Sequence, residues 1–241
     1  LSHLVLPKGE TPLTAWLEKY AETIIDSGYY KLLLEGLQNT IIITLGALAI
    51  GVIIGTGISV TKYFAEDVPA LKPLCFLCDF YITVIRGIPV VVLLLIFYFV
   101  IFAASDNGVL VATITFGINS GAYMAELIRS GIQAVDKGQM EAGRSLGLSK
   151  MQTMSRIIFP QAIRYILPAI GNEMIALLKE TAVAGYVAVQ DLTRAGNLIR
   201  NNTYDAVNPL LVVALTYLAM VIILTSLLGK FERRLKKSDK R

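Results

Sequence analysis

Opposite charges lie side by side in an apolar stretch of this 241-residue chain, at Lys179 and Glu180, and Thr181 follows them directly. A charged side chain inside a membrane segment costs roughly 2.5 to 3.5 kcal/mol, so its presence there needs a reason. One reason is binding, because an ammonium and a carboxylate complement a ligand that carries both charges. The other is an ion pair with a neighbouring helix, and the sequence leaves both readings open. Glu173 shares a helix face with Glu180, which is a weak indication of an acidic track.

A second set of polar residues lies on one helical stripe further up the chain. Glu126 and Arg129 are three residues apart, the spacing of an ion pair on one helix face, and we predict that role for them. Tyr123 and Asn119 lie one and two turns deeper on the stripe of Glu126, where they face either a polar cavity or the core. The candidate substrate-binding residues are thus Asn119, Tyr123, Glu180 and Thr181, and the candidate structural ion-pair residues are Glu126, Arg129 and Lys179.

Catalytic patterns are missing from the sequence. It contains no HExxH, GxSxG or GxxxxGK[ST] motif, and its single histidine, His3, lies far from the apolar runs. Cys75 and Cys78 form one CxxC, which is either a redox pair or two small apolar side chains; with no second CxxC we favour the latter. We therefore expect no catalytic residue, no metal ion and no cofactor in this chain, so any ATP must be bound by another polypeptide.

The composition predicts a membrane protein. Hydrophobic residues make up 55% of the chain and charged residues only 17%, a balance outside the range of soluble domains of this size. Crossing a hydrocarbon core of about 30 Å takes roughly 20 apolar residues. Five runs meet this length, which predicts an all-α integral membrane protein with about five transmembrane helices. The runs cover residues 37–60, 79–103, 109–128, 166–186 and 209–228.

Lys and Arg residues predict how the chain is oriented in the membrane. They are concentrated in the loop 129–164 and in the tail 230–241, and they are fewer between residues 187 and 208. The positive-inside rule then places the loop and the C-terminus in the cytoplasm and the N-terminus outside. Residues 1–35 lack signal-peptide features, and we expect an external amphipathic helix over residues 13–34. The organisation is an external segment (1–35), a transmembrane domain (36–230) with a cytoplasmic loop (130–164), and a basic cytoplasmic tail (231–241).

Glycines are frequent in the first apolar run. Gly51 and Gly55 have the spacing of a small-xxx-small pair, which lets another helix approach closely. The alternative is a Gly-rich spanning helix without such a contact, and the sequence favours neither.

The cytoplasmic loop contains a regular pattern of small, charged and apolar residues. Glu141, Ala142 and Gly143 are followed by Arg144, Gly147, Ile157, Phe159 and Pro160. Gly147 can turn the backbone between two short helices at low steric cost, and Ser149 is a candidate N-cap for the second helix, which Pro160 should close. Small side chains at 142, 143 and 147 would allow insertion into a cleft of a partner. The alternative is a solvated loop helix without a partner.

This spacing resembles the EAA motif of permeases in ATP-binding-cassette importers. Three further stretches resemble the polar amino-acid branch of that family: RGIP at 86–89, GAYMAELIRSG at 121–131 and LLKET at 177–181. The chain departs from the family pattern at Gly143, where a second Ala is usual, and at Phe159, where Leu is usual. It also has Glu180 in place of Asp, and Ala182 and Val183 in place of Ser and Leu, which bears on substrate choice.

The resemblance implies a type I importer permease fold and a transport function. Polar amino acids would cross the prokaryotic cytoplasmic membrane by alternating access, driven by separate ATPase subunits that bind ATP and Mg. Other implied partners are a second permease subunit, identical or not, an extracellular substrate-binding protein, the amino acid and membrane lipid, but no nucleic acid. A secondary transporter or channel without an ATPase, and a membrane scaffold, are the alternatives. The residues implied in coupling to the ATPase are Glu141, Ala142, Gly143, Arg144, Gly147 and Pro160.

Overall fold

Long apolar runs and few turn residues leave this chain one way to satisfy its backbone in a membrane, which is to form helices. The computed structural model describes residues 18, 20–65 and 68–237, and every regular element within them is helical. The elements labelled η are π-helical or 3₁₀ segments. In chain order they are η1 (Ala21–Asp26), α2 (Tyr30–Ala65), η2 (Pro69–Leu71), α3 (Lys72–Gly87), α4 (Val90–Ile96), η3 (Phe97–Ile101), α5 (Gly108–Gln133), α6 (Lys137–Ser145), α7 (Lys150–Thr153), η4 (Met154–Ile158), α8 (Phe159–Glu180), η5 (Thr181–Val187), α9 (Leu192–Thr203) and α10 (Asn208–Lys237).

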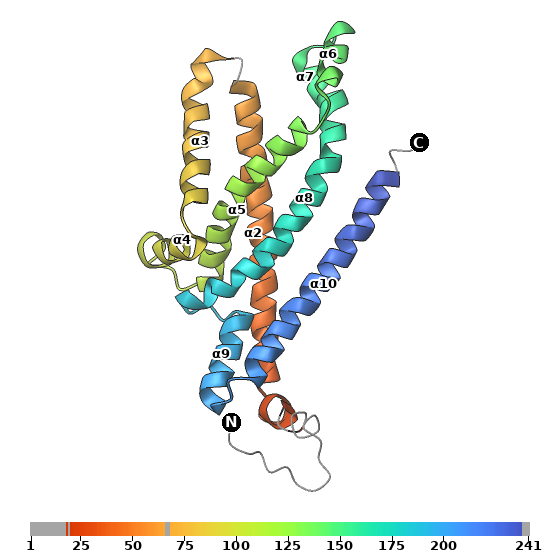
Figure 1. The fold of residues 1–241 in the computed structure, drawn as a ribbon. Helices are drawn as coiled ribbons and strands as arrows, with labels where there is room; N and C mark the ends of the chain where they lie inside the picture. Colours follow the sequence, from red (N-terminus) through yellow and green to blue (C-terminus); the bar gives the residue numbers. More distant parts are fainter. Residues whose placement is uncertain (1–17, 19, 66–67, 238–241) are drawn as a thin grey trace.

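The long helices run between two ends of the molecule. One end contains α6, α7, the last turns of α2 and α10 and the first turn of α3, whereas α9 and the first turn of α2 lie at the other (Figure 1). The chain thus starts its first long helix at one end and finishes its last at the opposite end. This arrangement matches an odd number of crossings.

Three of the described helices are long and apolar enough to cross a membrane, namely α2, α5 and α10. A fourth crossing results if the bent pair Pro69–Gly87 and Val90–Ile101 is taken as one span. The run expected at 166–186 falls on α8 and η5; α8 has 22 residues and is about 33 Å long, enough to cross, but it is less apolar than these three helices and carries charged residues. Such residues are tolerated where they face protein rather than lipid.

The second predicted span is wrong in shape. The sequence predicts one helix over residues 79–103, but the chain bends by 105° between α3 and α4. Pro89 causes the break: it lacks a backbone N–H and disfavours helical geometry in the preceding residue, and Ile88 is extended (φ −102°, ψ 131°). The crossing segment is therefore η2 with α3, while α4 lies crosswise near the middle of the molecule (Figure 1).

Glycines join α2 to α5. A Cβ atom at Gly51 would lie 2.7 Å from Oγ of Ser120, and one at Gly55 would lie 2.8 Å from the backbone nitrogen of Ala125. These distances leave no room for a side chain, so the small-xxx-small pair allows the two helices to touch. The reading of Gly51 and Gly55 as a close-packed contact is confirmed.

The external helix expected over residues 13–34 is only partly testable, because residues 13–17 and 19 lie outside the described part of the chain. In the described part, η1 ends at Asp26, Gly28 has a left-handed φ of 73°, and α2 begins at Tyr30. A single helix to residue 34 is therefore wrong. The glycine separates the outer turn from the first spanning helix because only glycine adopts this φ without steric cost.

Candidate functional site

The first candidate site is the docking segment, residues 137–158, which comprises α6, α7 and η4. Asp136 caps α6 by accepting a hydrogen bond from the backbone of Gly138 (2.7 Å). After α6 the chain reverses at Gly147, which has a φ of 81°. Ser149 then caps α7 in a capping box with Gln152, whose side chain accepts a hydrogen bond from the Ser149 backbone. The predicted turn at Gly147 and the predicted cap at Ser149 are both present.

Gly143 has a different role from the one expected. It is buried, and a Cβ atom there would lie 2.9 Å from Oγ1 of Thr153 and 3.2 Å from Cδ1 of Ile157. The missing side chain therefore lets α6 pack on α7 and η4, inside the docking segment. Glu141 and Ala142 are the neighbours that remain exposed and free to meet a partner.

Pro160 does not close the second short helix. The helical path continues from α7 through η4 into α8, and Pro160 occupies the first turn of α8. Proline is tolerated there because its missing N–H is one that the first turn leaves unpaired. The docking segment is consequently continuous with a spanning helix, so a displacement of α7 is passed directly to α8.

An apolar side chain stands out on the tip of the docking segment. Leu146 caps the end of α6 and is 80% exposed, and the neighbouring Met151 is also exposed. Arg144 supports this tip, because its Nη1 donates a hydrogen bond to the carbonyl oxygen of Leu148 (3.2 Å). Exposed apolar residues on the spans face lipid, but the tip lies beyond the spans at the end shown uppermost in Figure 1. A leucine in that position is suited to burial in another protein.

The second candidate site lies between α5 and α8. Oγ of Ser120 donates a hydrogen bond to Oε1 of Glu173 (3.1 Å), and Ser120 is itself fully buried. Glu173 and Glu180 are half-buried, and they are two turns apart on one face of α8. Two carboxylates near each other can hold a cationic group. The sequence pattern did not predict a role for Ser120, although it did single out Gly51, the residue against which Ser120 packs.

The four candidate substrate-binding residues are not equivalent. Asn119 and Thr181 are buried, and the hydroxyl of Thr181 donates to the carbonyl oxygen of Leu178 (2.8 Å). Tyr123 and Glu180 are half-buried. Tyr123 lies under the guanidinium of Arg86, whose Cζ atom is 5.1 Å from the ring centroid. Of the four, Tyr123 and Glu180 therefore keep access to a ligand in this protomer.

Lys179 was predicted to form an ion pair with a neighbouring helix. Its side chain is exposed, and within the described part of the chain it makes no ion pair. Adjacent residues on a helix point about 100° apart, so Lys179 turns away from the face that Glu180 shares with Glu173. The described part of this subunit thus contains no ion-pair partner for Lys179.

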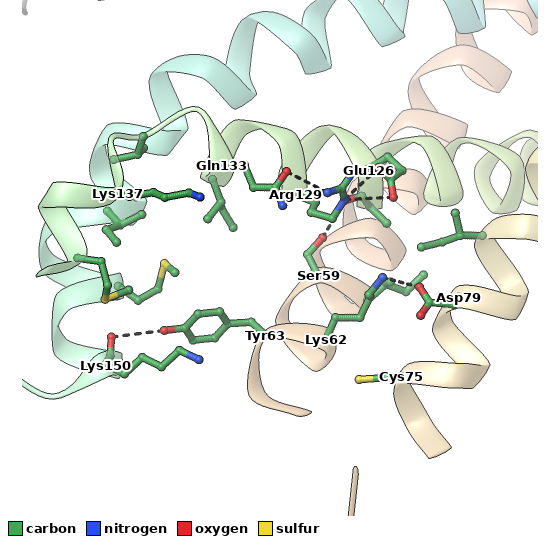
Figure 2. A pocket seen from close by; sticks show the side chains of 18 of the residues that line it. Ser59, Lys62, Tyr63, Cys75, Asp79, Glu126, Arg129, Gln133, Lys137 and Lys150 are labelled. Atoms are coloured by element: carbon green, nitrogen blue, oxygen red, sulfur yellow. Dashed lines mark hydrogen bonds and ion pairs between the residues drawn. The ribbon is translucent and has the colours of Figure 1, made fainter. Parts of the chain in front are cut away.

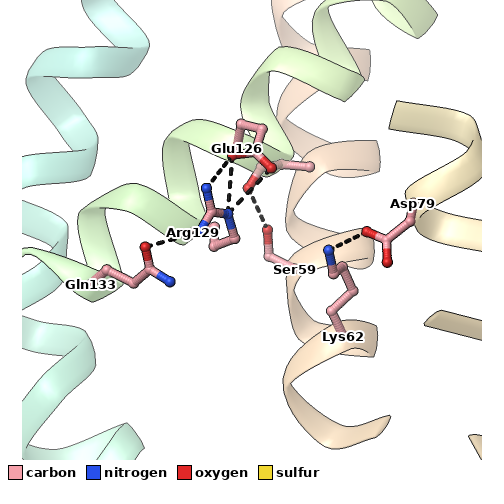
Figure 3. A network of polar contacts seen from close by, with 7 residues as sticks. Ser59, Lys62, Asp79, Glu126, Arg129 and Gln133 are labelled. Carbon is pink, nitrogen blue, oxygen red and sulfur yellow. Dashed lines mark hydrogen bonds and ion pairs between the residues drawn. The ribbon is translucent and has the colours of Figure 1, made fainter. Parts of the chain in front are cut away.

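Charged side chains also gather near the docking segment. Nη2 of Arg129 lies 2.6 Å from Oε2 of Glu126, and its Nη1 donates to Oε1 of Gln133 (2.9 Å), as Figure 3 shows. The predicted pairing of Glu126 with Arg129 is present. Lys62 of α2 and Asp79 of α3 form a second ion pair close by (Figure 3).

These pairs line a cleft of about 1040 Å³ between the ends of the spans and the docking segment (Figure 2). Ser59 and Lys62 come from α2, and Arg129 and Gln133 from α5, while Lys137 opens α6. Cys75 also lines this cleft; it and Cys78 are free thiols and half-buried, not buried as expected. The cleft separates α2 and α3 from the docking segment except where side chains reach across it.

At the opposite end, α9 is held by buried polar groups. Asp191 is fully buried and caps α9 through hydrogen bonds from the backbone of Thr193 and Arg194 (both 3.0 Å). Burial raises the pKa of the Asp191 carboxyl, and these hydrogen bonds lower it in part. The hydroxyl of Thr40 in α2 accepts from the backbone of Leu192 (3.2 Å), so the start of α9 is fastened to the first spanning helix.

Comparison with known proteins assigns the chain and its fold to one family. Residues 63–237 match the family described as "Binding-protein-dependent transport system inner membrane component". The chain therefore belongs to this family of inner-membrane transport components, and it is a permease subunit of an ATP-binding-cassette importer rather than its ATPase. The reading as a secondary transporter or channel is set aside.

Curated relatives match over nearly their whole length. The arginine transport system permease protein ArtQ of Bacillus subtilis is 36% identical over 210 residues, which are 86% of this chain and 94% of ArtQ. The glutamine transport system permease protein GlnP of Escherichia coli is 36% identical over 209 residues, 85% of this chain and 93% of GlnP.

Solved structures agree with the fold. One chain of an amino acid ABC transporter crystallised with histidines is 40% identical, with a TM-score of 0.81, covering 88% of this chain and 98% of that one. A chain of the MetNI methionine ABC transporter in an inward-facing conformation matches with a TM-score of 0.73 at 21% identity, covering 85% and 96%. The latter supports the type I fold alone.

Proposed function

We propose that this permease subunit carries polar amino acids into the cell by alternating access between the two sides of the membrane. The observation that carries the proposal is the pair of half-buried carboxylates, Glu173 and Glu180, on a helix continuous with the docking segment. A substrate group held by α8 and a partner that moves α7 would then act on one continuous helical path. Relatives named for arginine and for glutamine support this substrate class.

The substrate site consists of residues from α5 and α8. Glu173, held by Ser120, and Glu180 attract the ammonium or another cationic group of the amino acid. Tyr123 of α5 has the guanidinium of Arg86 of α3 over its ring. The Arg86 guanidinium is the group of this set that suits a carboxylate. Asn119 and Thr181 are buried and support the walls of this proposed substrate site.

ATPase subunits at the cytoplasmic end, a second permease subunit in the membrane and a binding protein outside complete the importer. ATPase subunits, which bind ATP and Mg, dock on Glu141, Ala142, Leu146 and Gly147 of the docking segment. A second permease subunit covers the exposed polar groups Arg86 and Lys179, because lipid would leave these charges unpaired at high cost. An extracellular binding protein delivers the amino acid near α9. In this orientation the N-terminus is outside and the C-terminus is in the cytoplasm.

Uptake by a reconstituted complex tests the substrate class. The chain is co-expressed with its ATPase subunit and binding protein, placed in liposomes, and supplied with labelled arginine, glutamine, histidine and, as an apolar control, leucine. We expect ATP-dependent uptake of at least one polar amino acid and none of leucine. Leucine uptake alone, or uptake without ATP, would overturn the proposal.

A Gly147→Val variant tests the docking role in the same preparation. A β-branched residue is strained at a φ of 81°, so the turn between α6 and α7 should be distorted while the spans remain intact. We expect less ATPase to co-purify with this variant than with the wild-type chain. Gly229→Val serves as the control, because space around Gly229 is open.

A further inference from the structure

One contact crosses the cleft from α2 to the docking segment. Oη of Tyr63, in the last turns of α2, donates a hydrogen bond to the carbonyl oxygen of Lys150 (3.4 Å) at the start of α7 (Figure 2). The ammonium of Lys150 lies over the Tyr63 ring, with Nζ 5.1 Å from its centroid. Tyr63 and Lys150 are 87 residues apart in sequence, and both line the cleft.

The helix that carries Tyr63 is firmly attached to the spans. Gly51 and Gly55 let α2 touch α5 along its length, and Oγ of Ser59 donates to the carbonyl oxygen of Ala125 (3.2 Å) one turn before Tyr63. A force applied at Tyr63 therefore acts on α2 and α5 together, because closely packed helices transmit displacement with little deformation.

We propose that Tyr63 is a positioning residue which, through Lys150, links the docking segment to α2 and passes its movement to the α2–α5 pair. The inference rests on the proposed docking function. It adds a route of transmission to α2, because the chain itself connects the docking segment only to α5, through residues 134–136, and to α8. With Tyr63 in place, α2, α5 and α8 respond to the same displacement of the docking segment. Ser120 and Glu173, on the two sides of the substrate site, then move together.

The two parts of the contact differ in strength. A hydrogen bond of 3.4 Å is weak, whereas a cation over an aromatic face contributes about 0.5 to 2 kcal/mol. Tyr63→Phe removes only the hydrogen bond and should keep most of the coupling between ATP hydrolysis and uptake. Tyr63→Ala removes both, and Lys150→Met removes the cation while Lys150→Arg retains it.

The test measures coupling in the reconstituted complex of this chain with its ATPase subunit and binding protein. Labelled arginine and labelled glutamine are the transport probes, and uptake is expressed per ATP hydrolysed. We expect Tyr63→Ala and Lys150→Met to lower this ratio by roughly three- to ten-fold, while Tyr63→Phe and Lys150→Arg stay near the wild-type value. Co-purification of the ATPase and its basal hydrolysis should be unchanged in Tyr63→Ala.

Tyr30→Ala is the matched control, because Tyr30 lies at the other end of α2 and, among the described residues, only its neighbour Lys31 lies over its ring, 6.0 Å from the centroid. Equal ratios for Tyr63→Ala and Tyr30→Ala would overturn the inference. If Tyr63→Ala fails to assemble, equal ratios for Lys150→Met and Lys150→Arg would overturn it. Failure of the wild-type complex to take up arginine, glutamine or histidine would instead refute the proposed function.

Discussion

Single residues in this permease subunit are placed by partners that are distant in sequence. Ser120 is buried between α2 and α8, where a glycine of α2 leaves room for it and a glutamate of α8 accepts a hydrogen bond from its hydroxyl group. Leu146, in contrast, is exposed at the tip of the docking segment. Both positions make a single substitution informative, because each side chain has one identifiable role.

Replacing Ser120 by alanine should weaken substrate binding by the complex. The change removes a hydrogen bond to a carboxylate, worth roughly 1.5 to 3 kcal/mol, and lets Glu173 leave its position. We expect the concentration for half-maximal uptake to rise about ten-fold. Thr216→Ala is the control, because that hydroxyl bonds only within its own helix, to the carbonyl oxygen of Val212 (2.8 Å). An equal effect of the two substitutions would contradict the role given to Ser120.

Leu146→Ala should weaken docking of the ATPase. Burying a leucine side chain contributes about 1.5 to 3 kcal/mol, so its loss should lower the affinity roughly ten-fold. Binding of purified ATPase to the permease in detergent measures this. Tyr204→Ala removes a side chain that is 94% exposed at the opposite end of the molecule and should leave the affinity unchanged. Unaltered affinity in Leu146→Ala would show that the tip is not buried by the ATPase.

Helices in this chain are joined either by close backbone contact or by short polar connections. The α2–α5 pair is of the first kind, because Gly46, Gly51 and Gly55 face side chains of α5 directly. The connection of α9 to α2 through Thr40 and Asp191 is of the second kind. In a membrane the first kind depends on van der Waals packing, since lipid offers no hydrophobic driving force between helices.

Gly55→Ala should destabilise the α2–α5 pair. The new methyl group would meet the backbone of Ala125 at 2.8 Å, and overpacking of this kind costs about 1 to 3 kcal/mol. Gly57→Ala, two residues along the same helix, has no atom within 4 Å of the new methyl group and should be neutral or slightly stabilising. Thermal unfolding in detergent compares the two variants. A lower midpoint for Gly57→Ala than for Gly55→Ala would refute the close contact.

At the scale of the whole molecule, the docking segment and α9 lie at opposite ends (Figure 1). The chain therefore presents one surface to each side of the membrane. Most of the basic residues of its loops lie at the docking end, so the positive-inside rule predicts that this end lies in the cytoplasm.

Site-directed labelling tests this orientation. In a background with Cys75→Ser and Cys78→Ser, a cysteine at exposed Asn201 in α9 should react with a membrane-impermeant maleimide in intact cells. A cysteine at Lys150 should react only after the cells are permeabilised. Labelling of position 150 from outside would reverse the orientation.

The sequence alone determined the features that depend on neighbouring residues. Apolar runs predicted the positions of the spanning helices, Gly147 and Ser149 predicted the turn and cap of the docking segment, and the Glu126–Arg129 spacing predicted an ion pair. These features are local because helical periodicity and backbone preferences act over a few residues. The bend at Pro89 has the same local origin, yet the length of the apolar run concealed it.

Only the tertiary structure decided which distant residues meet. Ser120 contacts Glu173 across 53 residues, and Tyr63 contacts Lys150 across 87. It also turned Gly143 inward and left Lys179 outside the ion pair expected for it. The physical reason is that such contacts depend on the rotation and separation of packed helices. Those are set by the summed packing of many side chains and are not encoded in the spacing of any one segment.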